Sequence, residues 1–287
     1  MKKCKKKSWN NFFLLFLHQK LIVYKCKHPA IMKYIHDFIL VNNFQINKNF
    51  SLLTTQLDSR LPEIKPGQFV EIRVDNASGV MLRRPVSIHD VDYTKNQIKL
   101  LIQNIGKGTE KLCELKKGEL LNMIYPLGNG FPIPTNENSP LLTGGGCGIA
   151  PLFFWGKYLS DNKIVPKFLI GAKSGSALIQ IEKFKKIGET FVTTEDGSNG
   201  HKGLITNHPV LNQKKLNFDI IYACGPEQMM KSLAEYAKLH EIDCYVSLEN
   251  RMACGIGACL CCIVSTVDGN KCTCVEGPVF NSKYLLW

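Results

Sequence analysis

The sequence has 287 residues, of which 45% are hydrophobic and 21% charged, the composition of an ordinary globular protein with room for two or three domains. A formal net charge of +12 suggests a nucleic-acid partner, but residues 1–31 contain eight lysines and no acidic residue. The rest of the chain therefore carries only +4, and we expect no nucleic-acid binding. Twelve cysteines that bunch toward the C-terminus argue against a disulfide-rich secreted protein and for metal ligation in a reducing cytoplasm.

Residues 1–31 combine this basic charge with a short apolar run over residues 12–17. Six apolar residues are too few to span a membrane, and no small-residue cleavage site of a signal peptide clearly follows them. We expect a disordered basic extension without membrane association. A weak tether to a membrane surface is the alternative.

Residues 32–133 are rich in β-forming residues, and Asn, Pro and Gly separate the runs. Within one run Val70, Ile72 and Val74 alternate with charged residues, which is typical of a half-buried strand. A small antiparallel β-barrel with one helix, Thr109 to Leu115, fits this pattern. The expected strands are Tyr34–Val41, Phe50–Leu57, Gln68–Val74, Ile98–Gln103 and Leu120–Ile124.

Two short motifs in this region have the chemistry of a flavin site. In Arg84-Pro85-Val86-Ser87 the guanidinium can grip a phosphate and the serine hydroxyl can reach a ring heteroatom. In Gly106-Lys107-Gly108-Thr109 the glycines allow backbone N–H groups to approach a pyrophosphate, and Thr109 can cap the following helix. The first motif alone is equally consistent with a turn that exposes an arginine. Together the two motifs favour FAD.

Residues 134–242 show the alternation of strands and helices that is typical of a parallel α/β domain. A polar, proline-bounded linker leads to a strand over residues 141–143 and then to the turn Gly144–Pro151, with the pattern G-x-G-x-x-P. Glycines between a strand and a helix form an anion site for a dinucleotide, although this is not the standard Rossmann fingerprint. A helix should start at Pro151, because proline suits the first helical turn. The further elements expected are Lys167–Ala172, Leu178–Lys186, Phe191–Glu195, Phe218–Cys224 and Glu227–His240.

Cys224-Gly225-Pro226 follows the expected strand that ends at residue 224. Ligands of parallel sheets bind at the carboxyl ends of the strands, so this turn is a candidate nucleotide contact. The alternative is that Cys224 is simply a small buried residue.

Six cysteines lie within 21 residues of residues 243–287, which is not a core-packing pattern. Four of them have the spacing C-x4-C-x2-C, with the fourth after eleven intervening residues, as in plant-type ferredoxins that bind a 2Fe–2S cluster. These predicted metal ligands are Cys254, Cys259, Cys262 and Cys274. Cys261 and Cys272 exceed the ligand count, while Gly255 and Gly257 suit a tightly turning loop. A zinc site or structural disulfides are the alternatives.

The combined motifs resemble the ferredoxin-reductase superfamily. The finer pattern, LRRPVSI, GKGT, PLGNGFP, GGGCGIAP, ACGPEQMM and ENRMACGIGACLCC followed by CVEGPVF, is similar to the electron transfer subunits of NAD-dependent (class 1B) dihydroorotate dehydrogenases. This likeness runs from about Met32 to Phe280. It implies an α+β multidomain fold with an antiparallel β-barrel FAD domain, a parallel α/β nucleotide domain and a C-terminal ferredoxin-like 2Fe–2S loop domain.

The resemblance also implies which residues hold each cofactor. Those for FAD are Arg84, Pro85, Val86, Ser87, Leu101, Ile102, Gln103, Gly108 and Thr109, and those for NAD are Gly146, Gly148, Cys224, Gly225 and Pro226. The family often has Tyr-Arg where this chain has Ile102-Gln103, so flavin contacts there would be mostly with the backbone. The chain also departs from the pattern at Cys147 and Cys261, which leave additional thiols near the redox centres.

The function implied is that of a cytoplasmic electron carrier in pyrimidine biosynthesis. An FMN-containing catalytic subunit would oxidise dihydroorotate, in an assembly of two copies of each subunit, and this chain would supply no catalytic acid or base. Two alternatives are a subunit that moves electrons between NAD(P)H and ferredoxin, and a non-enzymatic iron–sulfur sensor. The choice between NAD and NADP is open because Lys173 could be a solvated charge or a contact for a 2′-phosphate.

Overall fold

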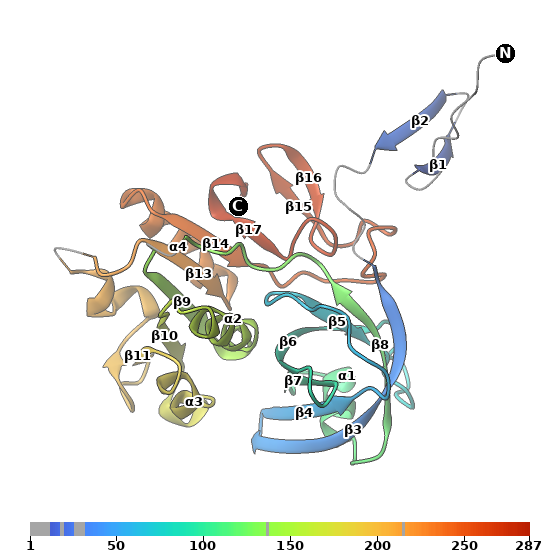
Figure 1. The fold of residues 1–287 in the computed structure, drawn as a ribbon. Coiled ribbons are helices and arrows are strands. Elements are labelled where there is room, and N and C mark those ends of the chain that lie inside the picture. Colours follow the sequence, from blue (N-terminus) through green and yellow to red (C-terminus); the bar gives the residue numbers. More distant parts are fainter. Residues whose placement is uncertain (1–11, 18–19, 26–31, 136–137, 214–215) are drawn as a thin grey trace. The chain divides into compact units, whose positions relative to one another are not determined.

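The computed structural model describes residues 12–17, 20–25, 32–135, 138–213 and 216–287 (Figure 1). The chain divides into two compact units, residues 1–32 and 33–287. In the first unit β1 (Phe12–Leu17) and β2 (Lys20–Lys25) form an antiparallel pair. This pair differs from the expectation of a disordered extension over residues 12–25, where aromatic and β-branched residues favour strands. The remainder of residues 1–31 lies outside the described residues.

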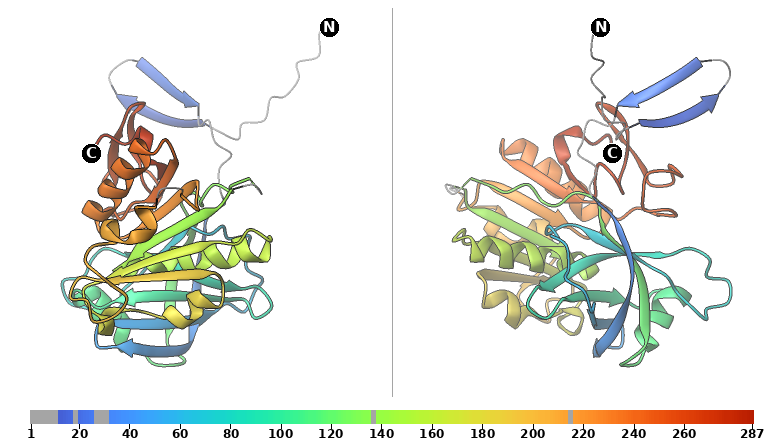
Figure 2. Two further views of the ribbon diagram at one scale, coloured as in Figure 1. Left: turned by 90° about the vertical axis from the view of Figure 1, so that its left-hand side faces the viewer. Right: turned by 45° about the vertical axis from the view of Figure 1, so that its right-hand side comes forward.

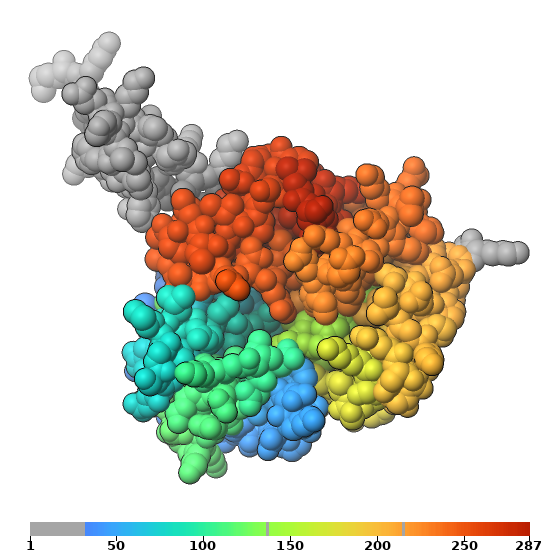
Figure 3. All heavy atoms as spheres, turned by 180° about the vertical axis from the view of Figure 1, so that it is seen from behind, coloured from blue at the N-terminus to red at the C-terminus, as the bar shows by residue number. Residues whose placement is uncertain are grey.

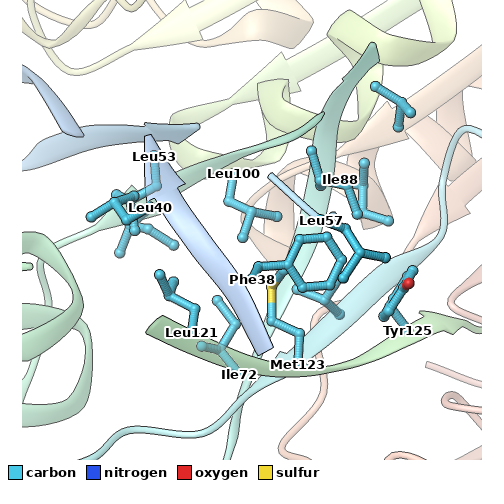
Figure 4. Packing of buried hydrophobic residues seen from close by; sticks show 14 of the residues in the cluster. Phe38, Leu40, Leu53, Leu57, Ile72, Ile88, Leu100, Leu121, Met123 and Tyr125 are labelled. Carbon is cyan, nitrogen blue, oxygen red and sulfur yellow. The ribbon is translucent and has the colours of Figure 1, made fainter. Parts of the chain in front are cut away.

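A closed six-stranded antiparallel barrel opens the second unit, in the order β3-β4-β7-β6-β5-β8. The strands are β3 (Tyr34–Asn47), β4 (Phe50–Gln56), β5 (Phe69–Ile72), β6 (Arg84–Asp92), β7 (Gln97–Gln103) and β8 (Leu120–Leu127). Helix α1 (Lys107–Glu114) lies between β7 and β8 in the chain. Side chains such as Phe38, Leu100 and Met123 fill the barrel (Figure 4). The predicted barrel with one helix is confirmed.

A seven-stranded sheet follows, in the order β12-β11-β10-β9-β13-β14-β17. Its strands are β9 (Pro140–Gly145), β10 (Lys167–Ala172), β11 (Glu189–Thr194), β12 (His201–Lys202), β13 (Ile220–Cys224), β14 (Asp243–Ser247) and β17 (Val279–Asn281). All neighbours pair in parallel except β14 and β17. The helices are α2 (Ile149–Asp161), α3 (Ile181–Lys185) and α4 (Glu227–Leu239). Helix α2 starts at Ile149, two residues before the predicted start, so Pro151 is its third residue and still lies in the first turn.

Helix α2 joins the barrel to the sheet, because it packs on both β6 and β9. The carboxylate of Asp90 on β6 accepts a hydrogen bond from the ammonium group of Lys157 on α2 and another from Lys99 on β7, each at 2.8 Å. Two opposite charges around a buried carboxylate offset its desolvation. Figure 2 shows the barrel, coloured blue to green, beside the sheet, coloured green to orange, from two further directions.

The C-terminal residues 243–287 contribute both to the sheet and to the cysteine loop, so the sheet ends later in the chain than expected. The sequence predicts a domain boundary at residues 242 and 243, yet β14 continues the parallel sheet to Ser247 and β17 extends it further. Between them lie a loop of bends and turns and the hairpin β15 (Ile263–Thr266) and β16 (Gly269–Cys272). In Figure 3 the orange residues of this segment lie against the cyan residues of the barrel. Within the described residues no helix is long and apolar enough to cross a membrane.

Candidate functional site: two cofactor sites and a cysteine loop

The two expected flavin motifs meet where β6 faces the start of α1. Gly108 lies directly under the Arg84 side chain, since a Cβ added to Gly108 would lie 2.5 Å from Arg84 Nε. Thr109 is the third residue of α1 and not its N-cap, and its hydroxyl accepts the N–H of Gly106 at 3.1 Å. A guanidinium above the first turn of a helix is suited to bind a pyrophosphate. The residues present therefore fit the phosphates of FAD.

The predicted flavin residues of β7 differ in what they present. Leu101 and Ile102 are buried, so only backbone groups of these residues are available to a ligand, while Gln103 lines a cavity. The carbonyl of Leu101 accepts a hydrogen bond from the thiol of Cys147 at 3.6 Å. This contact ties the glycine turn after β9 to the strand that carries the predicted flavin contacts.

The two predicted nucleotide motifs also lie together. Gly148 packs directly on the backbone after β13, because a Cβ on Gly148 would lie 2.2 Å from the carbonyl oxygen of Cys224 and 2.5 Å from the nitrogen of Gly225. Gly146 has a φ of +57° and Gly225 a φ of +150°, both in the region that favours glycine. Only glycine at position 148 allows the two turns to touch.

A cavity of about 570 Å³ opens at the carboxyl ends of β9, β10, β11 and β13. Four predicted nucleotide residues line it: Gly146, Gly148, Gly225 and Pro226. Cys224 is not among its lining residues; it is fully buried, and this burial raises the pKa of its thiol well above the ordinary value. Its side chain therefore fits the alternative interpretation, a small buried residue. The size and position of the cavity suit a dinucleotide that binds at the end of a parallel sheet.

The cavity also has lining residues that sequence reasoning missed. Glu195, directly after β11, and Phe50 of the barrel are two of them, and they line the cavity together with Lys173 and Gln103, which the sequence had indicated. Glu249 lies near the thiols of Cys147 and Cys224, and burial raises the pKa of its carboxyl. The sequence could have indicated Glu195, because it ends an expected strand and ligands bind at the ends of parallel strands. Nothing in the sequence indicated that Phe50 lines this cavity, since Phe50 belongs to the barrel and not to the nucleotide domain.

The four predicted ligand cysteines are arranged as two pairs. The first pair is Cys254 with Cys259, and the second is Cys262 with Cys274; in each pair the backbone N–H of the second residue donates to the sulfur of the first. Within the described residues no set of three or more His, Cys, Asp or Glu side chains is placed to hold a single metal ion. A 2Fe–2S cluster needs two thiolates on each iron, and two pairs match that requirement.

Backbone amides point at the sulfur atoms of this loop. The sulfur of Cys254 accepts the N–H of Ile256 at 3.5 Å and that of Cys259 at 3.4 Å, and the sulfur of Cys262 accepts the N–H of Cys274 at 3.4 Å. Burial is the largest effect on Cys254 and raises its pKa, but the amide hydrogen bonds outweigh it and lower the pKa to about 7. Such bonds favour thiolates and tune iron–sulfur clusters. The loop therefore fits this cofactor.

The two additional cysteines make other contacts. The thiol of Cys261 is exposed and donates to the carbonyl of Arg251 at 3.7 Å. Burial raises the pKa of Cys272, whose N–H bonds the carboxylate of Glu276 at 2.8 Å. Neither belongs to one of the two pairs, while Cys272 lies near enough to Cys254, Cys259 and Cys262 for their charges to act on its thiol. The set of four ligands stays a prediction.

A flavin barrel, a parallel nucleotide sheet and a C-terminal cysteine loop together define a flavin- and nicotinamide-dependent reductase of the ferredoxin-reductase type with an iron–sulfur domain. Residues 249–286 match the family profile described as iron-sulfur cluster binding domain of dihydroorotate dehydrogenase B. The chain belongs to the family of electron transfer subunits of dihydroorotate dehydrogenase B (NAD(+)).

Relatives of that description support the assignment over most of the chain. The protein of Bacillus mycoides (strain KBAB4) is 38% identical over 251 residues, which are 85% of this chain and 95% of that protein. The protein of Bacillus cereus (strain Q1) is 37% identical over the same shares.

Solved structures show the same fold. A structure of an NADH-dependent reduced ferredoxin-NADP oxidoreductase superposes with a TM-score of 0.79 at 30% identity, covering 91% of this chain and 92% of that one. A ferredoxin reductase in carbazole 1,9a-dioxygenase superposes with a TM-score of 0.63 at 19% identity, covering 76% and 69%. At that identity the second likeness concerns the fold alone.

Proposed function

We propose that this chain is the cytoplasmic electron transfer subunit of an NAD-dependent dihydroorotate dehydrogenase. It takes electrons from the FMN of a catalytic subunit and passes them through a 2Fe–2S cluster and FAD to NAD⁺, in pyrimidine biosynthesis and in an assembly of two copies of each subunit. The cluster transfers single electrons and FAD exchanges either one or two, which is the chemistry these groups supply when bound.

One observation supports this order of cofactors more than any other. Strands β5, β6 and β7 are consecutive neighbours in the barrel. β5 contacts the cysteine loop, since a Cβ on Gly255 would lie 2.8 Å from Glu71 Cγ. β6 carries the motif that begins with Arg84, and β7 ends with Gln103 at the nucleotide cavity. The proposed flavin site thus lies between the cluster loop and the nucleotide cavity.

The chain's own residues position these groups. Arg84 and the first turn of α1 hold the FAD phosphates, and the turns at Gly148 and Gly225 hold the NAD phosphates near the barrel. The four paired cysteines bind the cluster. Buried neighbours such as Phe69, Leu127 and Met252 pack against the cysteine loop and exclude water from its inner side.

The outer side of the loop suits the catalytic partner. Cys259 is exposed, and the large apolar side chains of Ile256 and Leu260 next to it are 49% and 57% exposed. Apolar side chains around a redox ligand are suited to a permanent interface, where they become buried. We assign this surface to the FMN-containing subunit.

The experiment compares the full-length chain with and without that partner under anaerobic conditions. Alone, the chain holding FAD and the cluster should lose its flavin absorbance on addition of NADH and reduce artificial dyes, without oxidising dihydroorotate. Adding the partner should confer electron transfer from dihydroorotate to NAD⁺. Robust dihydroorotate oxidation by the single chain, or a flavin that NADH does not bleach, would contradict the proposal.

A second candidate function is electron exchange between NADH and ferredoxin. The likeness to the NADH-dependent ferredoxin-NADP oxidoreductase structure over 91% of the chain favours it. Ferredoxin reduction by NADH that is faster than dihydroorotate-linked turnover with the partner would select this alternative.

A further inference from the structure

Glu71 is a fully buried carboxylate at the junction between the barrel and the cysteine loop. Along β5, Val70 and Ile72 belong to the barrel core, whereas Phe69 packs with Cys262 and Cys274 of the loop. Because side chains alternate along a strand, Glu71 shares the face of Phe69. It therefore points out of the barrel and toward the cysteine loop.

This carboxylate has no compensating hydrogen bond among the described residues. Both of its oxygens are buried without a partner, and Gly255 is so close that a Cβ there would lie 3.4 Å from Glu71 Oε1. Burial, the largest effect, raises the pKa of Glu71 to about 7, although the guanidinium groups of Arg83 and Arg84 oppose the shift. A buried, unpaired polar group requires an explanation other than packing.

Its neighbours are the proposed sites of two redox cofactors. In the β5–β6 ladder Glu71 is directly opposite Pro85, the second residue of the flavin motif. On its other side lies the thiol of Cys254, whose charge acts on the same carboxyl. Glu71 thus lies between the flavin strand and the first proposed cluster ligand.

A negatively charged carboxylate in a low-dielectric setting disfavours the addition of an electron to a nearby centre, and the effect falls with distance. Glu71 carries this charge at pH values above its raised pKa. Because Glu71 packs against Gly255, beside a proposed cluster ligand, its charge acts most strongly on the cluster. We propose that Glu71 lowers the reduction potential of the cluster relative to that of the flavin, so that electrons flow from the cluster toward FAD. This inference rests on the proposed function, and it concerns an equilibrium in which one electron changes site and no bond forms or breaks.

The test uses the full chain with both cofactors bound, at about pH 8.5, which lies above the pKa of about 7 to which burial raises the carboxyl of Glu71. EPR-monitored titration gives the potential of the cluster, and absorbance gives that of the flavin. Glu71→Gln should raise the equilibrium constant for cluster reduction about tenfold relative to the flavin, which for a one-electron couple is about 59 mV. Glu182→Gln, at an exposed position of α3 that pairs with Lys185, is the matched control and should change neither potential.

Two further variants separate charge from packing. Glu71→Asp keeps the charge and should hold the potential difference within about twofold of the original equilibrium, while Glu71→Met replaces the carboxylate by an apolar side chain of similar size and should act like Glu71→Gln. An unchanged difference in both neutral variants, or an equal shift in Glu71→Asp, would overturn the inference. A wild-type chain that binds no flavin or no cluster would instead contradict the proposed function.

Discussion

Replacing Gly148 by alanine adds one methyl group at the contact between the two turns of the proposed nucleotide site. The new Cβ would lie 2.2 Å from the carbonyl oxygen of Cys224, where ordinary contacts begin at 3.4 Å, so the two turns must separate by about 1 Å. Cys224 cannot yield freely, because it pairs with Gly144 on one side and Ser247 on the other. Overpacking of this kind costs about 1–3 kcal/mol.

The predicted consequence is a loss of nucleotide binding in addition to the loss of stability. A decrease of about 2 kcal/mol in the free energy of unfolding corresponds to a fall in Tm of about 4–8 °C for a domain of this size. Separation of the two turns should also raise the KM for NADH about tenfold, which corresponds to a loss of about 1.4 kcal/mol of binding free energy. Thermal unfolding and NADH-dependent dye reduction measure the two effects. The EPR signal of the cluster, in another part of the chain, should persist.

Gly118→Ala is the control for this experiment. Gly118 has a φ of +95° with nothing within 4 Å of an added Cβ, so alanine there costs backbone strain of about 1–2 kcal/mol without a clash. It should lower Tm and leave the KM for NADH unchanged. If Gly148→Ala has the original KM, or if both variants raise it equally, the reasoning about the contact between the turns is refuted.

Single Cys→Ser changes should abolish the EPR signal of the reduced cluster at each proposed ligand and preserve it at Cys261 and Cys272, because only the ligands belong to the two thiol pairs. The proposed ligands are Cys254, Cys259, Cys262 and Cys274. Loss of the signal at Cys272 with retention at Cys274 would show that the assignment is wrong. Glu195→Gln should raise kcat/KM for NADPH about tenfold and lower that for NADH, because a carboxylate at the end of β11 repels a 2′-phosphate while Lys173 remains in place. An unchanged ratio of the two kcat/KM values would exclude a role of Glu195 in the choice between NADH and NADPH. Glu189→Gln, at the exposed start of β11, is the control. Deletion of residues 1–31 should leave cofactor content and NADH-dependent dye reduction intact, because the basic excess is confined there, and a large decrease in either would make the segment part of the functional protein.

The local elements were within reach of the sequence because their signals are themselves local. Alternating apolar residues at Val70 and Ile72 predict a strand, and the spacing of Cys254, Cys259 and Cys262 predicts a cluster loop, since both patterns reflect neighbours along the chain. The glycine turn before Pro151 similarly predicts the start of a helix at a nucleotide site. Family resemblance then extended these local patterns to a set of cofactors.

Tertiary structure alone decided how these pieces meet. β14 and β17 join the nucleotide sheet although they flank the cysteine loop in the chain, because strand pairing depends on partners that are distant in sequence. The sequence predicts a nucleotide role for Cys224 from its position at the end of a strand, but its side chain is fully buried in a hydrophobic cluster and only its backbone contacts Gly148. In the sequence, Glu71 is one of the charged residues that alternate with apolar residues in a predicted half-buried strand. The cysteine loop covers this face of the barrel, and this cover makes Glu71 a buried carboxylate between two proposed redox sites.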